Sequence, residues 1–239
     1  MNNHPITPPH DTPGDHGSAL TGAGEGQHQE CRPDRDRAGE GEDQALVTEA
    51  LQALKAQGGE VVAHIGRLDD EAGCQQLIEL AIEQFGQLDI LIHNAGWVGY
   101  QDIEDQQEAF LERALGISVH APVWLAKHAW RHLKRSAAPR VVLTTSDRAM
   151  YQRYSQPGLV AYSAGKMAQV GIMNALSMEG QEHGILVNAI SPVAKTRMWG
   201  VTQAPEELKP EWVTPGLLYL ASSLCRDTGY ILRASNGQF

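Results

Sequence analysis

Two observations predict an α/β fold with a parallel sheet that is covered by helices on both faces. From residue 44 onward, short apolar runs alternate with longer segments whose apolar side chains recur at helical spacing. Strands joined by helices of this length run parallel. The run "LDILIHNAG" (88–96) is almost continuously apolar, which is typical of a strand covered on both faces. Ligands of such a sheet bind beyond the carboxyl ends of its strands.

The individual elements follow in chain order. "QALVTEALQALKAQ" (44–57) is a predicted helix with one apolar side, and two glycines end it. "EVVAHI" (60–65) is a predicted short strand. The other predicted elements are helices over 72–86, 105–135 (interrupted at 116–122), 162–179 and 214–224, and strands over 88–96, 140–146, 185–191 and 229–235.

Composition and charge exclude several classes of protein. A chain of 239 residues is long enough for one sizeable α/β domain. Its net charge of -10 argues against nucleic acid or an anionic membrane as the main partner, and no apolar run approaches membrane-spanning length. Three widely spaced cysteines and ten histidines without metal-ligand spacing favour a reducing, cytoplasmic location and no metal.

The chain divides into two unequal parts at residue 42. Residues 1–42 are rich in proline, glycine and charge, and we expect them to be largely disordered, whereas residues 43–239 form a single domain. Gly22 and Gly26 in "TGAGEG" (21–26) suit a turn that binds phosphate groups. The amphipathic helix that should follow such a turn is missing, because the next seventeen residues are almost wholly polar.

The segment "AYSAGK" (161–166) carries the strongest candidate chemistry. Tyr162 and Lys166 are four residues apart, so in a helix they project from one side. A nearby ammonium lowers the pKa of a phenol toward the range that proton transfer needs. Ser146, at the end of a predicted strand, is placed to hold a substrate oxygen against the phenol. Taken alone, Y-x-x-x-K occurs by chance in many chains, and Lys166 then serves only as a solvated helix residue.

Five motifs in order change that balance: "LDILIHNAG", "RVVLTTS", "YSAGK", "ILVNAISP" and "DTGYILRASNGQF". Together they resemble the short-chain dehydrogenase/reductase family over about residues 45–239. The resemblance implies an oxidoreductase that uses NAD or NADP and interconverts a secondary alcohol and its ketone on a Rossmann-type doubly wound parallel sheet. It further implies that Tyr162 exchanges a proton with the substrate oxygen, that Lys166 lowers the pKa of Tyr162 and binds the nicotinamide ribose, and that Ser146 positions the substrate.

The same resemblance assigns the remaining site residues. The fourth catalytic position, usually Asn, falls on Ser118. The resemblance implies that the cofactor is bound by these residues: Gly22, Gly26, Asn94, Ala95, Gly96, Tyr162, Lys166, Pro192 and Thr196. The stretch 195–231 is similar to the hydroxyacyl-CoA dehydrogenase module of multifunctional enzyme type 2, which implies a 3-hydroxyacyl-CoA or a steroid-like alcohol as substrate.

Departures from the family pattern leave alternatives open. His93 replaces the first Asn of the family's N-N-A-G, His28 replaces a glycine of the phosphate loop, and the interval from Ser146 to Tyr162 is about three residues longer than usual, which predicts a bulged loop. No candidate exists for the first helix and second strand of the usual fold. We therefore expect a sheet without them, in which 60–65 pairs with a strand at 17–20; otherwise the sheet begins at residue 60.

Three interpretations of the whole chain remain at this point. The first is an active dehydrogenase. The second is a non-catalytic family member that keeps the oligomerising scaffold but has lost dinucleotide binding. The third is a normal dehydrogenase whose first forty or so residues come from a mis-started or frame-shifted reading. In this family the two long helices around "WLAKHAW" (124–130) and "YSAGK" (162–166) pair with their copies, which implies a homodimer or homotetramer; the alternative is that Trp124 and Trp130 only cover the sheet.

Overall fold

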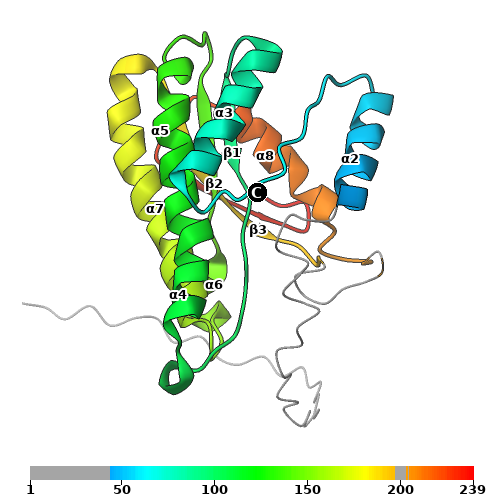
Figure 1. Ribbon diagram of the computed structural model, residues 1–239. Coiled ribbons are helices and arrows are strands. Elements are labelled where there is room, and N and C mark those ends of the chain that lie inside the picture. Colours follow the sequence, from blue (N-terminus) through cyan, green and yellow to red (C-terminus); the bar gives the residue numbers. More distant parts are fainter. Residues whose placement is uncertain (1–43, 197–202, 204) are drawn as a thin grey trace, which may run out of the picture.

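A parallel sheet forms the centre of the computed structural model, which describes residues 44–196, 203 and 205–239 (Figure 1). Its strands are β1 (Ile90–His93), β2 (Arg140–Thr144), β3 (Leu186–Val193) and β4 (Ile231–Ser235). They lie in chain order, and every neighbouring pair within these residues is parallel. The predicted α/β class with a parallel sheet is confirmed. The predictions for residues 1–42, including Gly22, Gly26 and the strand at 17–20, lie outside the described residues.

Helices connect the strands and flank the sheet. They are α2 (Gln44–Ala56), α3 (Glu71–Phe85), α4 (Glu108–Leu115), α5 (Ala121–Leu133), α6 (Asp147–Met150), α7 (Val160–Gly180) and α8 (Thr214–Ala221). A π-helical turn, Gly116–His120, joins α4 to α5 at the predicted interruption. Short 3₁₀ turns are formed by Ile103–Asp105, Gln152–Tyr154, Gln181–His183 and Pro210–Trp212.

Two apolar layers enclose the sheet. Helices α3, α5 and α7 cover one face, where Ile78, Leu125 and Met173 pack against alternate residues of β2 and β3 (Figure 1). Helix α8 covers the other face, where Leu220 packs with Ile190 and the remaining alternate residues. Strands β2 and β3 therefore present successive side chains to different helices. None of the helices in the described ranges has both the length and the apolar character that crossing a membrane requires.

The first strand departs from the prediction that both of its faces are covered. Leu91 and His93 are buried, but Ile90 and Ile92 are each 41% exposed. The reason is that the helices described against β1 lie on the side of Leu91. A continuous apolar run thus does not require cover on both faces.

The prediction of a strand over 60–65 is wrong. These residues adopt no strand within the described parts of the chain, and the sheet there begins at Ile90 rather than at residue 60. Val62 and Ile65 are 37% and 51% exposed. A strand needs a neighbour to accept its backbone hydrogen bonds, and the sheet as described gives this segment none. The predicted helix before it, α2, is confirmed.

Candidate active site

The carboxyl ends of β1 and β2 meet beside the first turns of α7. Thr144 Oγ1, at the end of β2, donates a hydrogen bond to Asn94 Oδ1 at 3.2 Å and so links the two strands. Gly96, two residues later, lies against Lys166: a β-carbon built on Gly96 would stand 3.3 Å from Lys166 Nζ. Any larger side chain at Gly96 would have to displace the ammonium. Ala95 between them is exposed.

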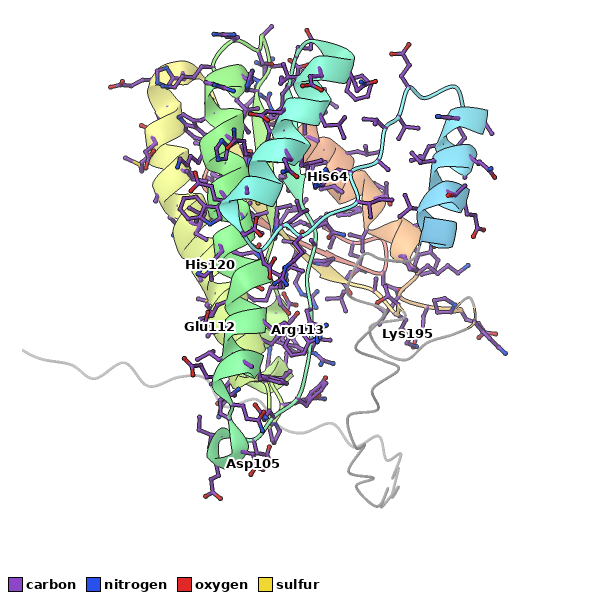
Figure 2. The ribbon with its side chains drawn as sticks, viewed as in Figure 1. His64, Asp105, Glu112, Arg113, His120 and Lys195 are labelled. Carbon is purple, nitrogen blue, oxygen red and sulfur yellow. The ribbon has the colours of Figure 1, made fainter. Side chains whose placement is uncertain are left out.

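Packing against α4 holds the loop after β1 in place. The Trp97 ring meets the Phe110 ring edge-on, with centroids 4.8 Å apart. The guanidinium of Arg113, labelled in Figure 2, lies 4.7 Å from the centroid of the Trp97 ring. An aromatic ring that contacts both a second ring and a cation has few alternative positions. Trp97 is therefore held against α4.

Lys166 is buried, and its ammonium is anchored to the end of β2. Its Nζ donates a hydrogen bond to the carbonyl oxygen of Thr144 at 2.8 Å, and the residue is only 4% exposed. Burial lowers the pKa of Lys166 from 10.5 to about 8. Two further bonds join the same elements: Thr145 Oγ1 donates to the Lys166 carbonyl at 2.8 Å, and Thr144 N donates to Gln169 Oε1 at 3.1 Å.

Ser146 and Tyr162 lie together on the same side of the sheet. Ser146 caps the start of α6 by accepting a hydrogen bond from Arg148 N at 3.3 Å, and Tyr162 lies in the first turn of α7. Ser146 also lies close enough to the Tyr162 phenol to lower the phenol's pKa. The structure thus brings together two side chains that are sixteen positions apart in the sequence.

The expected lowering of the Tyr162 pKa is not found in this structure. Burial is the largest influence and raises the pKa of Tyr162 above its ordinary value, although nearby Ser146 and the charge of Arg148 act in the opposite direction. The ammonium of Lys166 is directed at the Thr144 carbonyl and the backbone of Gly96. The prediction assumed that the Lys166 ammonium would lie close enough to the Tyr162 phenol to lower its pKa. In the structure the Thr144 carbonyl at the end of β2 holds that ammonium instead.

Ser118 lies in the π-helical turn and faces α7. It is 1% exposed, and a β-carbon added to Gly165 would lie 2.7 Å from Ser118 Cβ. Gly165 precedes Lys166, so only the absence of a side chain there lets the π-helical turn approach α7 so closely. Ser118 therefore packs against the turn of α7 that carries both Tyr162 and Lys166, at the position of Gly165.

The last described candidates, Pro192 and Thr196, lie in β3 and in the segment that follows it. Pro192 lies in β3 and is paired with Ala234 of β4, and both Pro192 and Thr196 are partly buried. Lys195, labelled in Figure 2 beyond the end of β3, forms an ion pair with Glu207 at 2.6 Å. This pair ties the segment after β3 back to the residues before α8. The candidates Gly22 and Gly26 lie outside the described residues.

His93 is a buried histidine beside the ammonium of Lys166. It is 2% exposed, and burial, followed by the charge of Lys166, lowers the pKa of His93 from 6.5 to about 4. Gln169 and the Ile117 backbone lie near enough to raise this pKa slightly, yet neither meets the ring with good hydrogen-bond geometry, and both ring nitrogens lack a partner among the described residues. His93 is therefore neutral at pH 7.

This burial makes the stability of the fold depend on pH. Between about pH 6.5 and pH 4 the unfolded chain binds a proton at His93 that the native protein does not bind, so the free energy of unfolding falls as the pH falls, by about 3 kcal/mol from this group. Urea unfolding at several pH values measures the slope. We expect His93→Asn to lose less stability than the parent over this interval. Equal slopes in the two proteins would contradict a depressed pKa at His93.

Several residues of the site had no role in the sequence-based predictions. The interval after Ser146 was predicted to be a bulged loop, but it forms α6 and the 3₁₀ turn Gln152–Tyr154. Arg148 of α6 donates to the Tyr100 hydroxyl at 2.8 Å, and its charge acts on Tyr162. The signal that could have revealed α6 was a serine followed by an aspartate, a typical helix start. Within the described ranges, no cluster of three or more side chains is suited to binding a metal ion.

Comparison with known proteins decides the family. The model of the short chain dehydrogenase family matches residues 40–207, which is most of the chain. The chain belongs to the short-chain dehydrogenase family. This short-chain dehydrogenase is 29% identical over 226 residues to a short-chain type dehydrogenase/reductase of Mycobacterium tuberculosis, covering 92% of this chain and 77% of that protein.

Two further relatives bear on fold and cofactor. The short-chain dehydrogenase is 29% identical over 209 residues to mouse peroxisomal multifunctional enzyme type 2, covering 84% of this chain but only 27% of the mouse protein. A solved short chain dehydrogenase of Shigella flexneri, complexed with NADP, is similar with a TM-score of 0.69 and 28% identity over 80% of this chain and 82% of that one. The predicted family and Rossmann-like fold are thereby confirmed.

Proposed function

We propose that this short-chain dehydrogenase interconverts a secondary alcohol and its ketone with NAD or NADP, and that Tyr162 is its acid and base. One observation carries the proposal: Ser146 and Tyr162 lie close together at the carboxyl end of the sheet, with Lys166 one helical turn from Tyr162. A residue that follows β2 and two residues of α7 therefore lie where ligands of parallel sheets bind. The Shigella relative, which was solved with NADP, supports the choice of cofactor.

The described residues fit the nicotinamide half of such a cofactor. Gly96 offers backbone without a side chain beside Lys166, which leaves room for a ribose to approach the ammonium. Asn94 to Gly96, Lys166, Pro192 and Thr196 would hold this half of the molecule. When bound, the nicotinamide supplies or accepts a hydride. Gly22 and Gly26, which would hold the phosphates, lie outside the described residues.

The proposed proton chemistry uses this chain's own side chains. In reduction, the Tyr162 hydroxyl gives its proton to the ketone oxygen as that oxygen gains negative charge, and the Ser146 hydroxyl donates a hydrogen bond to the same oxygen. In oxidation the phenolate takes the proton back from the alcohol. Ser146 and the positive charge of Arg148 favour the phenolate that results, against the burial that raises the pKa of Tyr162.

For the substrate we propose a 3-hydroxyacyl-CoA, with a steroid-like alcohol as the second choice. The similarity to multifunctional enzyme type 2 supports this class, although the chain spans about a quarter of the mouse protein. Purified protein should reduce NAD⁺ or NADP⁺, followed by absorbance, with 3-hydroxyacyl-CoA esters but not with the free hydroxy acids. If only a steroid alcohol is turned over, the substrate class is the steroid-like alcohol instead. Ser146→Ala is the control for cofactor reduction that does not take place at this site.

A second candidate is a non-catalytic family member that keeps the scaffold alone. The observation in its favour is that residues 60–65, where the family's nucleotide-binding half should continue, form no strand. It predicts a folded protein without affinity for nicotinamide cofactors. The buried, hydrogen-bonded surroundings of Lys166 favour the active enzyme, because a scaffold gains nothing from burying an ammonium.

We also propose that the protein forms a homodimer or homotetramer in the cytoplasm through α7 and α5. Small or apolar residues of α7 form an exposed stripe: Val160, Ala164, Met167, Gly171, Ala175 and Met178. Met178 is 65% exposed, and Val123 of α5 is 38% exposed. A stripe of this kind suits close helix pairing. Cys74 and Cys225 are free and buried, which suits a reducing compartment.

Substitution of Met167 tests the proposed interface. Met167→Glu places a charge in the middle of the stripe, so we expect it to convert the oligomer to monomers with little loss of secondary structure. Light scattering during size-exclusion chromatography measures the mass. Glu79→Lys, on α3 away from the stripe, is the control and should remain oligomeric. A parent protein that is monomeric at micromolar concentration would refute the proposal.

A further inference from the structure

A buried carboxylate lies directly after Ser146 and joins the active-site helix to two strands. Asp147 is 6% exposed. Its Oδ1 accepts a hydrogen bond from Ser191 Oγ at 2.5 Å, and its Oδ2 accepts one from Arg233 Nε at 2.5 Å. Both oxygens of the carboxylate are therefore used within the protein. No part of the chemistry proposed above uses any of these three groups.

The register of the sheet explains how one carboxylate meets both donors. Ser191 of β3 and Arg233 of β4 are direct neighbours in the parallel pairing, so their side chains leave the same face side by side. That face also carries Ala189 and Ile231, which pack toward the layer that includes α7. Asp147, the first residue of α6, therefore connects that helix to both β3 and β4.

The backbone before Asp147 is fixed in the same way. Thr145 N donates to the carbonyl oxygen of Ile190 at 2.9 Å, which extends the contact between β2 and β3 up to the residue before Ser146. Ser146 is thus held on both sides, by Thr145 through the backbone and by Asp147 through its side chain. Because Ser146 begins α6 as its cap, a small rotation of α6 would move the Ser146 hydroxyl away from Tyr162.

The Arg233 guanidinium, which binds Asp147, also lies near an aromatic ring. Arg233 lies 5.9 Å from the ring centroid of Tyr154, in the 3₁₀ turn that follows α6. Hydrogen bonds between ionised groups are about twice as strong as neutral ones, and a buried carboxylate that loses its cation is strongly destabilised. The side chain of Arg233 is 49% exposed, so its loss changes the cluster without opening the core.

We propose that Asp147, held by Ser191 and Arg233, is a positioning residue that keeps the Ser146 hydroxyl directed at the Tyr162 phenol. The inference rests on the proposed roles of Ser146 and Tyr162 in the reaction, but the contact itself can be measured without turnover. The residues involved come from α6, β3, β4 and α7. The closing strand of the chain therefore contributes to the site through Arg233, although it touches no reacting group.

The test follows the ionisation of Tyr162 by NMR, with tyrosine labelled at Cζ and the Tyr162 signal assigned by its loss in Tyr162→Phe. Because nearby Ser146 lowers the pKa of Tyr162, we expect Ser146→Ala to raise this pKa by about half a unit to one unit. Arg233→Gln should raise it by a similar amount. In the Ser146→Ala background, Arg233→Gln should add almost nothing, because both changes remove the same contact.

Ser191→Ala separates positioning from simple loss of charge. It removes one bond to Asp147 without changing any charge, so we expect it to raise the pKa of Tyr162 in the parent but not in Ser146→Ala. Arg233→Lys should restore most of the parent value. Arg226→Gln, at an exposed arginine, removes the same charge elsewhere and should have no effect.

The outcomes decide the proposal whether or not the enzyme is active. An unchanged pKa of Tyr162 in both Arg233→Gln and Ser191→Ala overturns it, as does an equal shift with and without Ser146. If the protein turns over, Arg233→Gln should lower kcat about tenfold with the KM for the cofactor unchanged. A protein without turnover that still shows the non-additive shifts would refute the proposed function and keep the positioning role.

Discussion

Tyr162→Phe lowers kcat by about 10²–10⁴-fold and leaves the Kd for NADH unchanged, because the substitution removes only the proton that the phenol would exchange with the substrate oxygen. The ring of Tyr162 stays in place at the start of α7, so the fold is preserved. Steady-state assays give kcat, and a fluorescence titration gives the Kd.

Another tyrosine provides the matched control for this prediction. Tyr219 lies on α8, against the opposite face of the sheet, and is 41% exposed. Tyr219→Phe should therefore retain activity close to that of the parent. If Tyr162→Phe kept more than about a tenth of the parent kcat, Tyr162 would not be the general acid and base of this enzyme.

Lys166→Met should abolish turnover while leaving the protein as stable as the parent or more stable. At pH 7 the native state carries a buried ammonium whose pKa is about 8 instead of 10.5, which corresponds to a penalty of about 3 kcal/mol. Met fills the same space without a charge, but the Thr144 carbonyl loses its partner, which costs about 1–3 kcal/mol. We expect the free energy of unfolding to change by between 0 and about +2 kcal/mol.

Chemical denaturation with a surface control checks the sign of that change. Lys134→Met alters an exposed lysine that follows α5, so it should affect neither stability nor activity to a comparable degree. A loss of more than about 2 kcal/mol in Lys166→Met would mean that the ammonium stabilises the fold, contrary to its low pKa. For the same reason the free energy of unfolding should fall as the pH is lowered from about 10.5 to 8, because in this interval only the unfolded chain keeps the proton.

The elements most accessible from sequence were those with a complete apolar pattern. Helices α3 and α7 and strands β2 and β3 lie where periodicity predicted them, because their apolar residues meet partners that are also within the sheet and its helices. The segment 60–65 had the composition of a strand, but composition cannot supply the neighbouring backbone that a strand requires.

For the candidate site, the sequence indicated which residues to compare but not the contacts among them. Ser146 was expected after a strand and Tyr162 in a helix, and their proximity was implied by the resemblance to the short-chain dehydrogenase family. The direction of the Lys166 ammonium could not be foreseen, since it depends on the Thr144 carbonyl at the end of another element. The link from Asp147 to Arg233 spans 86 positions and rests on strand register, which no local pattern encodes.

The central claim is that this chain, as an active short-chain dehydrogenase, binds a nicotinamide cofactor beside Tyr162 and Lys166. Titration of NADH or NADPH into the purified protein, followed by the fluorescence of the reduced nicotinamide, tests it most directly. We expect a saturable change with one of the two cofactors at micromolar to sub-millimolar concentration, which Gly96→Val weakens by displacing the ammonium. A folded protein that shows no saturation with either cofactor, up to millimolar concentration, would contradict the claim and favour the non-catalytic scaffold.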